Sequence, residues 1–581
     1  MKRTKIVCTI GPSTEKIEII EELLKNGMNV ARFNFSHGNH EEQKLKMDAV
    51  KEASRRTGIP VGLMLDTKGP EMRLGTFKAG KVFLEKGRPF LLTGREIEGD
   101  ENGVSINHQT LASEVKPGDA ILLSDGLIEL VVESTDGLDI HTMVQNNGDI
   151  SNNKRIAAPG VSLNLPPLSK KDISDILFGI EEDVDFIAAS FVQRASDALA
   201  IRRLLEERGA SIQIIAKIEN AEGVKNMEEI LDVVDGFMVA RGDLGVEIPA
   251  EDVPLIQKRM IRMCNEVGKP VITATQMLES MIANPRPTRA EASDVANAIL
   301  DGTDAIMLSG ETASGQYPIE AVKTMNLIAK RIEVALNPEI NLTRFGHGQT
   351  NTTNAISHAT VQISLKLNAK AVITATESGF TAQMVSRYRP HSRIIAVSPH
   401  EKTVRKLQLV WGVFAIKGAS RGDTDTMTQE AMRLALEEKY ISEGDLVIVT
   451  AGVPIGTTGT TNMIQVHIAG EALLEGQGIG KKAVSGKVVI VRDSADAEKF
   501  TPGDILVSSI LPAELGKIAS QASGIILEED GLTSAGAIIA VTFGIPAIVG
   551  VKNAIQSVQN GMEITLDPTR GKAFHGKLNL H

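Results

Sequence analysis

One stretch near the middle of the sequence joins ionisable residues to a strand, helix, strand pattern. A short apolar run, Ile212–Ile218, carries Lys217 and presents Glu219 at its end. An amphipathic run follows, and a second apolar run, Gly236–Ala240, leads into Asp243. In parallel α/β sheets and barrels, ligands bind at this end of the strands. One lysine and two carboxylates there indicate a metal-assisted reaction on an anion. The alternative is that these strand ends are charged merely because they are exposed to solvent.

Further polar residues stand at or just past the ends of other predicted strands. Carboxylates and hydroxyls with few histidines suit a hard cation such as Mg2+ or Mn2+, which takes one or two protein carboxylates and completes its shell with substrate oxygens and water. Arginine and lysine side chains would meet phosphate or carboxylate oxygens. The pattern favours a metal-dependent phosphoryl-transfer or enolate-type reaction. The set comprises Arg32, Asn34, Ser36, His37, Asp66, Thr67, Lys68, Arg73, Arg241, Gly242, Thr273, Thr275, Gln276, Ser309, Gly310 and Glu311.

The elements that must position these residues form eight short β-rich runs, most of them separated by amphipathic helical stretches. Strands alternating with helices predict a parallel sheet, and eight repeats predict an α/β fold closed into a (β/α)8 barrel. A doubly wound open sheet is the rival, but neither GxGxxG after a strand nor GxxxxGK[ST] occurs. The runs are Lys5–Ile10, Asn29–Phe33, Gly62–Leu65, Asp185–Ala189, Ile212–Ile218, Gly236–Ala240, Pro270–Ala274 and Ala305–Leu308. A short helix is expected to begin within 241–244, where free N–H groups would bind a carboxylate.

The chain of 581 residues is too long for one core, so several domains are expected. The catalytic barrel is predicted from residues 1–69 and 167–340. Between them, 70–166 shows short alternating segments and no convincing helix, which indicates an inserted small β-barrel domain. That insertion could close over the site as a lid, or be a decorated loop without a mechanical role. Residues 341–473 predict an open α/β domain. A Gly-rich linker lies around residues 471–482, and 474–581 predict an extra C-terminal unit.

Composition limits the class of protein. The formal net charge of -11 argues against non-specific binding to nucleic acid. Two cysteines, Cys8 and Cys264, cannot build a disulfide framework, so a reducing compartment fits. No apolar run approaches the roughly 20 residues of a membrane helix. A soluble cytoplasmic protein without a nucleic-acid or membrane partner is therefore predicted.

Five motifs make the sequence resemble the pyruvate kinase family. They occur in order, and the resemblance extends from about residue 1 to about residue 473. It includes the predicted insertion and the α/β domain after the barrel. The motifs are ARFNFSHG (31–38), LDTKGPEMR (65–73), KIENAEG (217–223), ARGDLGVE (240–247) and ATQMLESM (274–281).

The resemblance implies a reaction and a role for each matching residue. The family transfers the phosphoryl group of phosphoenolpyruvate to ADP and protonates the enolate to pyruvate, giving ATP. Lys217 would stabilise the transferring phosphoryl group and the enolate, and Glu219 and Asp243 would bind Mg2+ or Mn2+. The remaining matches are Arg32 for the substrate phosphate, Arg73 and Lys154 for the nucleotide phosphates, and Gly242 and Thr275 for the substrate carboxylate, with Thr275 also relaying the proton.

The resemblance also implies a monovalent cation, an effector and a homotetramer. Asn34, Ser36, Asp66 and Thr67 resemble the family's K+ site, and Glu71 resembles the glutamate of potassium-dependent members. The family's allosteric phosphate site would use Thr376, Ser378, Gly379 and Thr381, completed by the loop 452–462, and would take a phosphorylated effector. A plain helix N-cap is the alternative for those four residues.

The C-terminal unit departs from most of the family. Its segment DGLTSAGAIIAVTFGIPAIVG (530–550) resembles the swivelling phosphohistidine domain of phosphoenolpyruvate-utilising phosphotransferases, but Ala535 stands where that motif places the histidine. Two alternatives to an allosteric kinase remain at this point. A phosphohistidine phosphotransferase is disfavoured by Ala535, and a degenerate kinase kept as a metabolite-binding regulator is disfavoured by the intact set of barrel residues.

Overall fold

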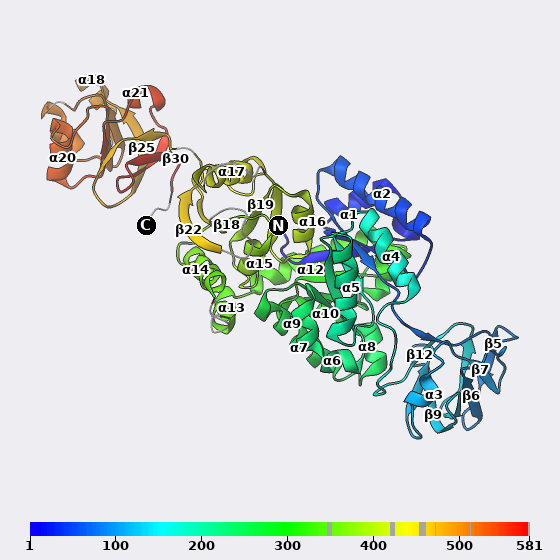
Figure 1. Ribbon diagram of the computed structural model, residues 1–581. Helices are drawn as coiled ribbons and strands as arrows, with labels where there is room; N and C mark the ends of the chain where they lie inside the picture. The colour runs from blue at the N-terminus through cyan, green and yellow to red at the C-terminus, as the bar shows by residue number, and fades with distance from the viewer. Residues whose placement is uncertain (346–350, 419–423, 453–460, 471, 512, 579–581) are drawn as a thin grey trace. The chain divides into compact units, whose positions relative to one another are not determined.

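The computed structural model describes residues 1–345, 351–418, 424–452, 461–470, 472–511 and 513–578 (Figure 1). The chain forms two compact units. The first contains Met1–His358 and Thr376–Lys417, and the second contains Ala359–Ala375, the described part of Gly418–Thr457, and the described residues from Thr461 onward.

Eight parallel strands of the first unit close into a barrel, which confirms the predicted fold and excludes the open sheet. Around the barrel the order is β1, β17, β16, β15, β14, β13, β3 and β2. Each strand lies within two residues of its predicted bounds. The strands are β1 (Lys5–Thr9), β2 (Val30–Asn34), β3 (Gly62–Asp66), β13 (Phe186–Ala189), β14 (Gln213–Ile218), β15 (Gly236–Ala240), β16 (Val271–Ala274) and β17 (Ala305–Leu308).

The barrel strands are apolar throughout because they are buried on both faces. Residues that face the interior, such as Met64, Phe186, Met238 and Ile272, form one buried cluster. Residues that face outward pack against the helices and form a larger cluster. The main helices around the barrel, shown in Figure 1, are α1 (Ile17–Lys25), α2 (His40–Thr57), α4 (Lys170–Glu181), α5 (Ala195–Glu207), α7 (Met227–Val233), α9 (Val253–Val267), α10 (Arg289–Asp301) and α12 (Pro318–Ile332).

The insertion between β3 and α4 is built almost entirely from strands. Seven strands form one sheet in the order β4, β12, β8, β9, β10, β6, β7, and β11 pairs with β5 in a two-stranded ribbon. A short helix, α3 (Leu111–Glu114), departs from the expectation that the insertion has none. The strands are β4 (Met72–Arg73), β5 (Lys81–Leu84), β6 (Pro89–Thr93), β7 (Gly103–Ser105), β8 (Ala120–Leu123), β9 (Ile128–Thr135), β10 (Asp139–Val144), β11 (Gly148–Ser151) and β12 (Arg155–Ala157).

The α/β segment after the barrel contributes to both units. In the first unit, β19 (Arg393–Ser398) and β20 (Val413–Lys417) are parallel neighbours, and α15 (Phe380–Ser386) precedes them. In the second unit, β18 (Ala371–Ala375) pairs in parallel with β21 (Leu446–Gly452), which pairs antiparallel with β22 (Thr461–Ile468). Parallel strands with intervening helices are the expected α/β pattern.

The C-terminal segment of the second unit contains an eight-stranded sheet with its own buried cores. Its helix α20 (Ala535–Phe543) begins at the position where the related motif carries histidine. The sheet order is β23 (Leu474–Glu475), β30 (Lys572–His575), β29 (Glu563–Asp567), β25 (Val484–Ile490), β26 (Ile505–Ser508), β27 (Gly524–Leu527), β28 (Ala547–Val549) and β24 (Gln477–Ile479).

Among the described residues, no helix is both long and apolar enough to cross a membrane.

Candidate functional site

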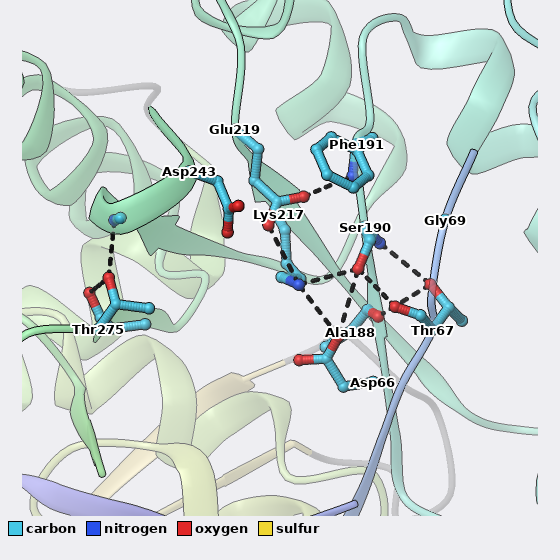
Figure 2. A network of polar contacts seen from close by, with 12 residues as sticks. Asp66, Thr67, Gly69, Ala188, Ser190, Phe191, Lys217, Glu219, Asp243 and Thr275 are labelled. Atoms are coloured by element: carbon cyan, nitrogen blue, oxygen red, sulfur yellow. Dashed lines mark hydrogen bonds and ion pairs between the residues drawn. The ribbon is translucent and has the colours of Figure 1, made fainter. Parts of the chain in front are cut away.

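A buried ionic network lies at the carboxyl ends of the barrel strands (Figure 2). The Lys217 Nζ is 3.1 Å from a carboxylate oxygen of Asp66 and 3.1 Å from one of Glu219. Asp66 also accepts a hydrogen bond of 2.6 Å from Arg32 Nε. The side chains of Asp66 and Glu219 are each only 1% exposed. The structure therefore brings four of the predicted residues into one continuous chain of opposite charges.

Strand register explains this assembly. In the parallel pair of β2 and β3, Arg32 lies opposite Met64 and Asn34 opposite Asp66. In the pair of β14 and β15, Ile218 lies opposite Val239, so Glu219 follows at the same level as the end of β15. Residues far apart in the sequence thus meet because all eight strands end at the same rim.

The network sets the charge of its members. Burial alone would lower the pKa of Lys217, but the carboxylates of Asp66 and Glu219 raise it above its ordinary value, so the ammonium stays charged. Burial would raise the pKa of Asp66, but Arg32 and Lys217 together lower it. Burial raises the pKa of Glu219 to about 7; Asp243 adds repulsion, while Lys217 opposes the shift. A cation beside Glu219 and Asp243 would relieve this repulsion.

Two residues of this network, Ser190 and Phe191, were not among the predicted site residues. Lys217 Nζ donates to Ser190 Oγ at 2.8 Å, and Ser190 Oγ donates to the Thr67 carbonyl at 2.6 Å. The Phe191 N–H donates to Glu219 Oε2 at 2.7 Å, although Phe191 has an unfavourable φ of 57°. Their position directly after the fourth predicted strand was the available signal, because the other predicted residues of the barrel site stand at or near such strand ends.

The end of β16 is strained and is connected to the end of β15. Thr275 has φ 64° and Gln276 has φ 54°, which is rare for a β-branched residue such as threonine. The Gly242 N–H donates to Thr275 Oγ1 at 2.8 Å, and Arg241 Nη2 donates to the Thr275 carbonyl at 2.7 Å. Gly242 and Thr275, both predicted contacts of the substrate carboxylate, are therefore adjacent. The expected short helix is α8 (Arg241–Glu247).

Glu219 and Asp243 lie side by side in Figure 2, and Asp243 is the more accessible, with its side chain 34% exposed. In this structure the Asp243 carboxylate forms an ion pair with Arg155, which the sequence did not identify. A buried carboxylate beside a partly exposed one fits a hard divalent cation. Within the described residues no group of three or more acidic, histidine or cysteine side chains could hold a metal ion. In general, Mg2+ takes one or two protein carboxylates and completes its shell with substrate oxygens and water.

The residues predicted to hold K+ lie on two neighbouring strand ends. Asn34 Oδ1 accepts from the Ser36 N–H at 3.0 Å. Asp66 and Thr67 are buried, and Thr67 Oγ1 accepts from the Ser190 N–H at 3.1 Å. Together, Asn34, Ser36, Asp66 and Thr67 offer several oxygens to a monovalent cation. The negative charge of Asp66 is already balanced by Arg32 and Lys217.

The two residues predicted to meet nucleotide phosphates belong to the insertion. Arg73 lies on β4 and forms an ion pair of 2.5 Å with Glu71, so the negative charge of Glu71 is balanced locally. Lys154 is exposed and directly precedes β12, which pairs with β4. They are thus neighbours on the inserted sheet.

The four residues predicted for an allosteric site surround the start of α15. Thr376 Oγ1 accepts from the Gly379 N–H at 2.9 Å, and Gly379 has φ 87°, which favours glycine. Ser378 is exposed, and its Oγ accepts a long 3.4 Å hydrogen bond from the Phe380 N–H. Thr381 is buried. Most of the loop 452–462 lies outside the described residues.

The helix start in the C-terminal unit has no imidazole. Ser534 caps α20 by accepting from the Ala537 N–H at 3.2 Å, and Ala535 is exposed. The histidines of this unit, His575 and His581, lie far downstream in the sequence. A methyl group cannot accept a phosphoryl group, so the chemistry of a phosphohistidine carrier is absent at position 535.

Comparison with known families assigns the three segments separately. Residues 1–322 match the pyruvate kinase barrel domain, and residues 354–467 match the pyruvate kinase alpha/beta domain. Residues 500–571 match the mobile domain of PEP-utilising enzymes. The barrel match alone covers more than half of the 581 residues.

Several relatives resemble the chain over its whole length. A pyruvate kinase of Sporosarcina psychrophila is 51% identical over 586 residues, covering 100% of both chains. One from Staphylococcus epidermidis is 50% identical over 584 residues, also with 100% coverage of both. The crystal structure of a pyruvate kinase from Cryptosporidium parvum superposes with a TM-score of 0.77 at 38% identity, covering 81% of this chain and 96% of that one.

Proposed function

The chain belongs to the pyruvate kinase family, and from this premise we propose how its own residues catalyse the family's reaction. That reaction transfers the phosphoryl group of phosphoenolpyruvate to ADP and gives pyruvate and ATP. The observation that carries the proposal is the charged ammonium of Lys217, held 3.1 Å from Glu219 at the ligand-binding rim of the barrel. Phosphoryl transfer needs positioning and neutralisation of dispersed negative charge more than covalent catalysis.

We propose that Lys217 stabilises the transferring phosphoryl group and the enolate, and that Arg32 binds the substrate phosphate. Both cations are buried and fixed by Asp66, so they require little reorganisation when negative charge develops. Arg73 and Lys154 on the inserted sheet would meet the nucleotide phosphates. The rigidity of the barrel cations and the accessibility of the insertion's cations match these two tasks.

Glu219 and Asp243 would hold Mg2+ or Mn2+. When bound, the cation would neutralise negative charge on the phosphate and enolate oxygens. Gly242 and Thr275 would orient the substrate carboxylate by a backbone N–H and a hydroxyl. Thr275 would also pass a proton to the enolate carbon. Because a threonine hydroxyl is a weak acid, water must supply that proton through it.

Purified protein should form pyruvate from phosphoenolpyruvate and ADP only when Mg2+ or Mn2+ is present. We expect activity to fall about tenfold or more when tetramethylammonium replaces K+, since a monovalent cation among the oxygens of Asn34, Ser36, Asp66 and Thr67 would support binding of an anionic substrate. A coupled assay that varies each ion separately measures both. No pyruvate under any condition would favour a regulator without catalytic activity, and full activity without K+ would contradict the potassium site alone.

We also propose a phosphorylated effector at Thr376, Ser378, Gly379 and Thr381, on the basis of family membership. Ser378→Asp adds a negative charge beside the exposed hydroxyl and should repel such an anion. The half-saturating concentration of phosphoenolpyruvate in wild type should shift when sugar phosphates or nucleotides are added, and the variant should lose that shift while keeping its maximal rate. An equal shift in both proteins would place the effector elsewhere.

Family membership further supports the proposal of a cytoplasmic homotetramer.

A further inference from the structure

Arg155 is the first residue of β12 in the insertion, and it reaches the catalytic rim of the barrel. Its side chain is 10% exposed and forms an ion pair with the Asp243 carboxylate. Its guanidinium group also lies over the Phe191 ring, 4.7 Å from the ring centroid. A planar guanidinium that is both stacked and ion-paired is held in a defined place.

Through these two contacts Arg155 is coupled to both carboxylates that we assign to the divalent cation. It binds Asp243 directly. The residue under its guanidinium, Phe191, donates its N–H to Glu219 Oε2 at 2.7 Å. Burial would lower the pKa of Arg155, but Asp243, Glu219, Glu247 and Glu71 together raise it, so the guanidinium stays charged.

The guanidinium of Arg155 and a divalent cation would both bind the carboxylate of Asp243. The hydrogen bond from Arg155 occupies Oδ1 of Asp243, which leaves only Oδ2 to a directly bound cation, and the two positive charges repel each other at short range. We propose that Arg155 competes with the divalent cation for Asp243 and thereby sets the metal affinity of the site. This inference rests on the proposed role of Asp243 as a metal ligand.

The competition has a clear signature in metal binding measured without substrate. Mn2+ binding to the full-length protein can be followed by electron paramagnetic resonance of the free ion. Arg155→Gln removes the positive charge and should lower the dissociation constant of Mn2+ about tenfold. Arg155→Lys keeps the charge but loses the planar fork, so the decrease should be smaller.

Arg194 provides a matched control. It also connects the barrel to the insertion, since its Nη2 donates to Ser162 Oγ at 3.2 Å while its Nε donates to Glu222 at 2.7 Å. Neither partner belongs to the proposed metal site. Arg194→Gln should therefore leave the Mn2+ dissociation constant unchanged, which separates competition at Asp243 from a general loosening of the insertion.

A double-mutant cycle decides the mechanism. In an Asp243→Asn background, Arg155→Gln should no longer tighten Mn2+ binding to the same extent. If Asp243→Asn weakens Mn2+ binding but Arg155→Gln leaves it unchanged or weaker, Arg155 does not compete, and the metal assignment still stands. A raised KM for ADP with unchanged Mn2+ affinity would make Arg155 a nucleotide contact instead. If Asp243→Asn itself leaves Mn2+ binding unchanged, the proposed metal site is wrong.

Discussion

Replacing Lys217 with methionine should lower turnover by about a hundredfold to a thousandfold or more, the effect of removing one preorganised group that stabilises developing negative charge. Methionine fills a similar volume but carries no charge. Lys217 acts mainly on charge that appears in the transition state, so phosphoenolpyruvate should still bind in the presence of metal. Steady-state kinetics with a separate measurement of substrate binding distinguish these two effects.

The expected loss for Lys217→Met depends on the protein remaining folded. Asp66 keeps its 2.6 Å partner Arg32 in the variant, whereas Glu219 loses its ion pair with Lys217 and keeps the Phe191 N–H. Thermal unfolding should therefore be recorded beside activity. Lys225→Met changes an exposed lysine on the next helix, α6 (Ala221–Lys225), and should leave turnover unchanged. Turnover of Lys217→Met within tenfold of wild type would refute the role of this ammonium.

Glu219→Gln and Asp243→Asn should each weaken activation by Mg2+ or Mn2+ about tenfold or more, because each removes a charged ligand from a hard cation. The amides keep the shape of the side chains. The glutamine of the first variant could still accept from the Phe191 N–H, and the asparagine of the second could still accept from Arg155, so loss of charge is the main change. The measurement is the metal concentration that gives half-maximal activity at saturating phosphoenolpyruvate and ADP.

Glu222→Gln is the matched control for the carboxylate variants. Glu222 stands three residues after Glu219, but it pairs with Arg194 at 2.7 Å. Its removal should not change the metal titration. An unchanged titration in both Glu219→Gln and Asp243→Asn would show that the divalent cation uses other ligands.

The barrel could be predicted from the sequence because its determinants are local. Each strand is a short apolar run that ends in a charged or polar group, and β15 (Gly236–Ala240) was predicted with its observed bounds. Eight such runs separated by amphipathic helices leave few ways to bury every strand on both faces. Closure then brings the ends together, which is why Arg32, Asp66, Lys217 and Glu219 could be expected at one site.

The hydrogen bonds and ion pairs among the site residues were decided by tertiary contacts that leave no local pattern in the sequence. Ser190 joins Lys217 to Thr67 only because β13 lies between β3 and β14 in the closed barrel. Phe191 donates a hydrogen bond to Glu219 through its backbone N–H, and such a donor does not depend on the type of side chain. The ion pair of Arg155 depends on how the inserted sheet meets the rim, because Arg155 reaches Asp243 across 88 residues of sequence. The sequence by itself thus determined which charges gather at the strand ends, and the tertiary structure decided which of them neutralise one another, because pairing depends on distances of a few ångströms between segments that are remote in the chain.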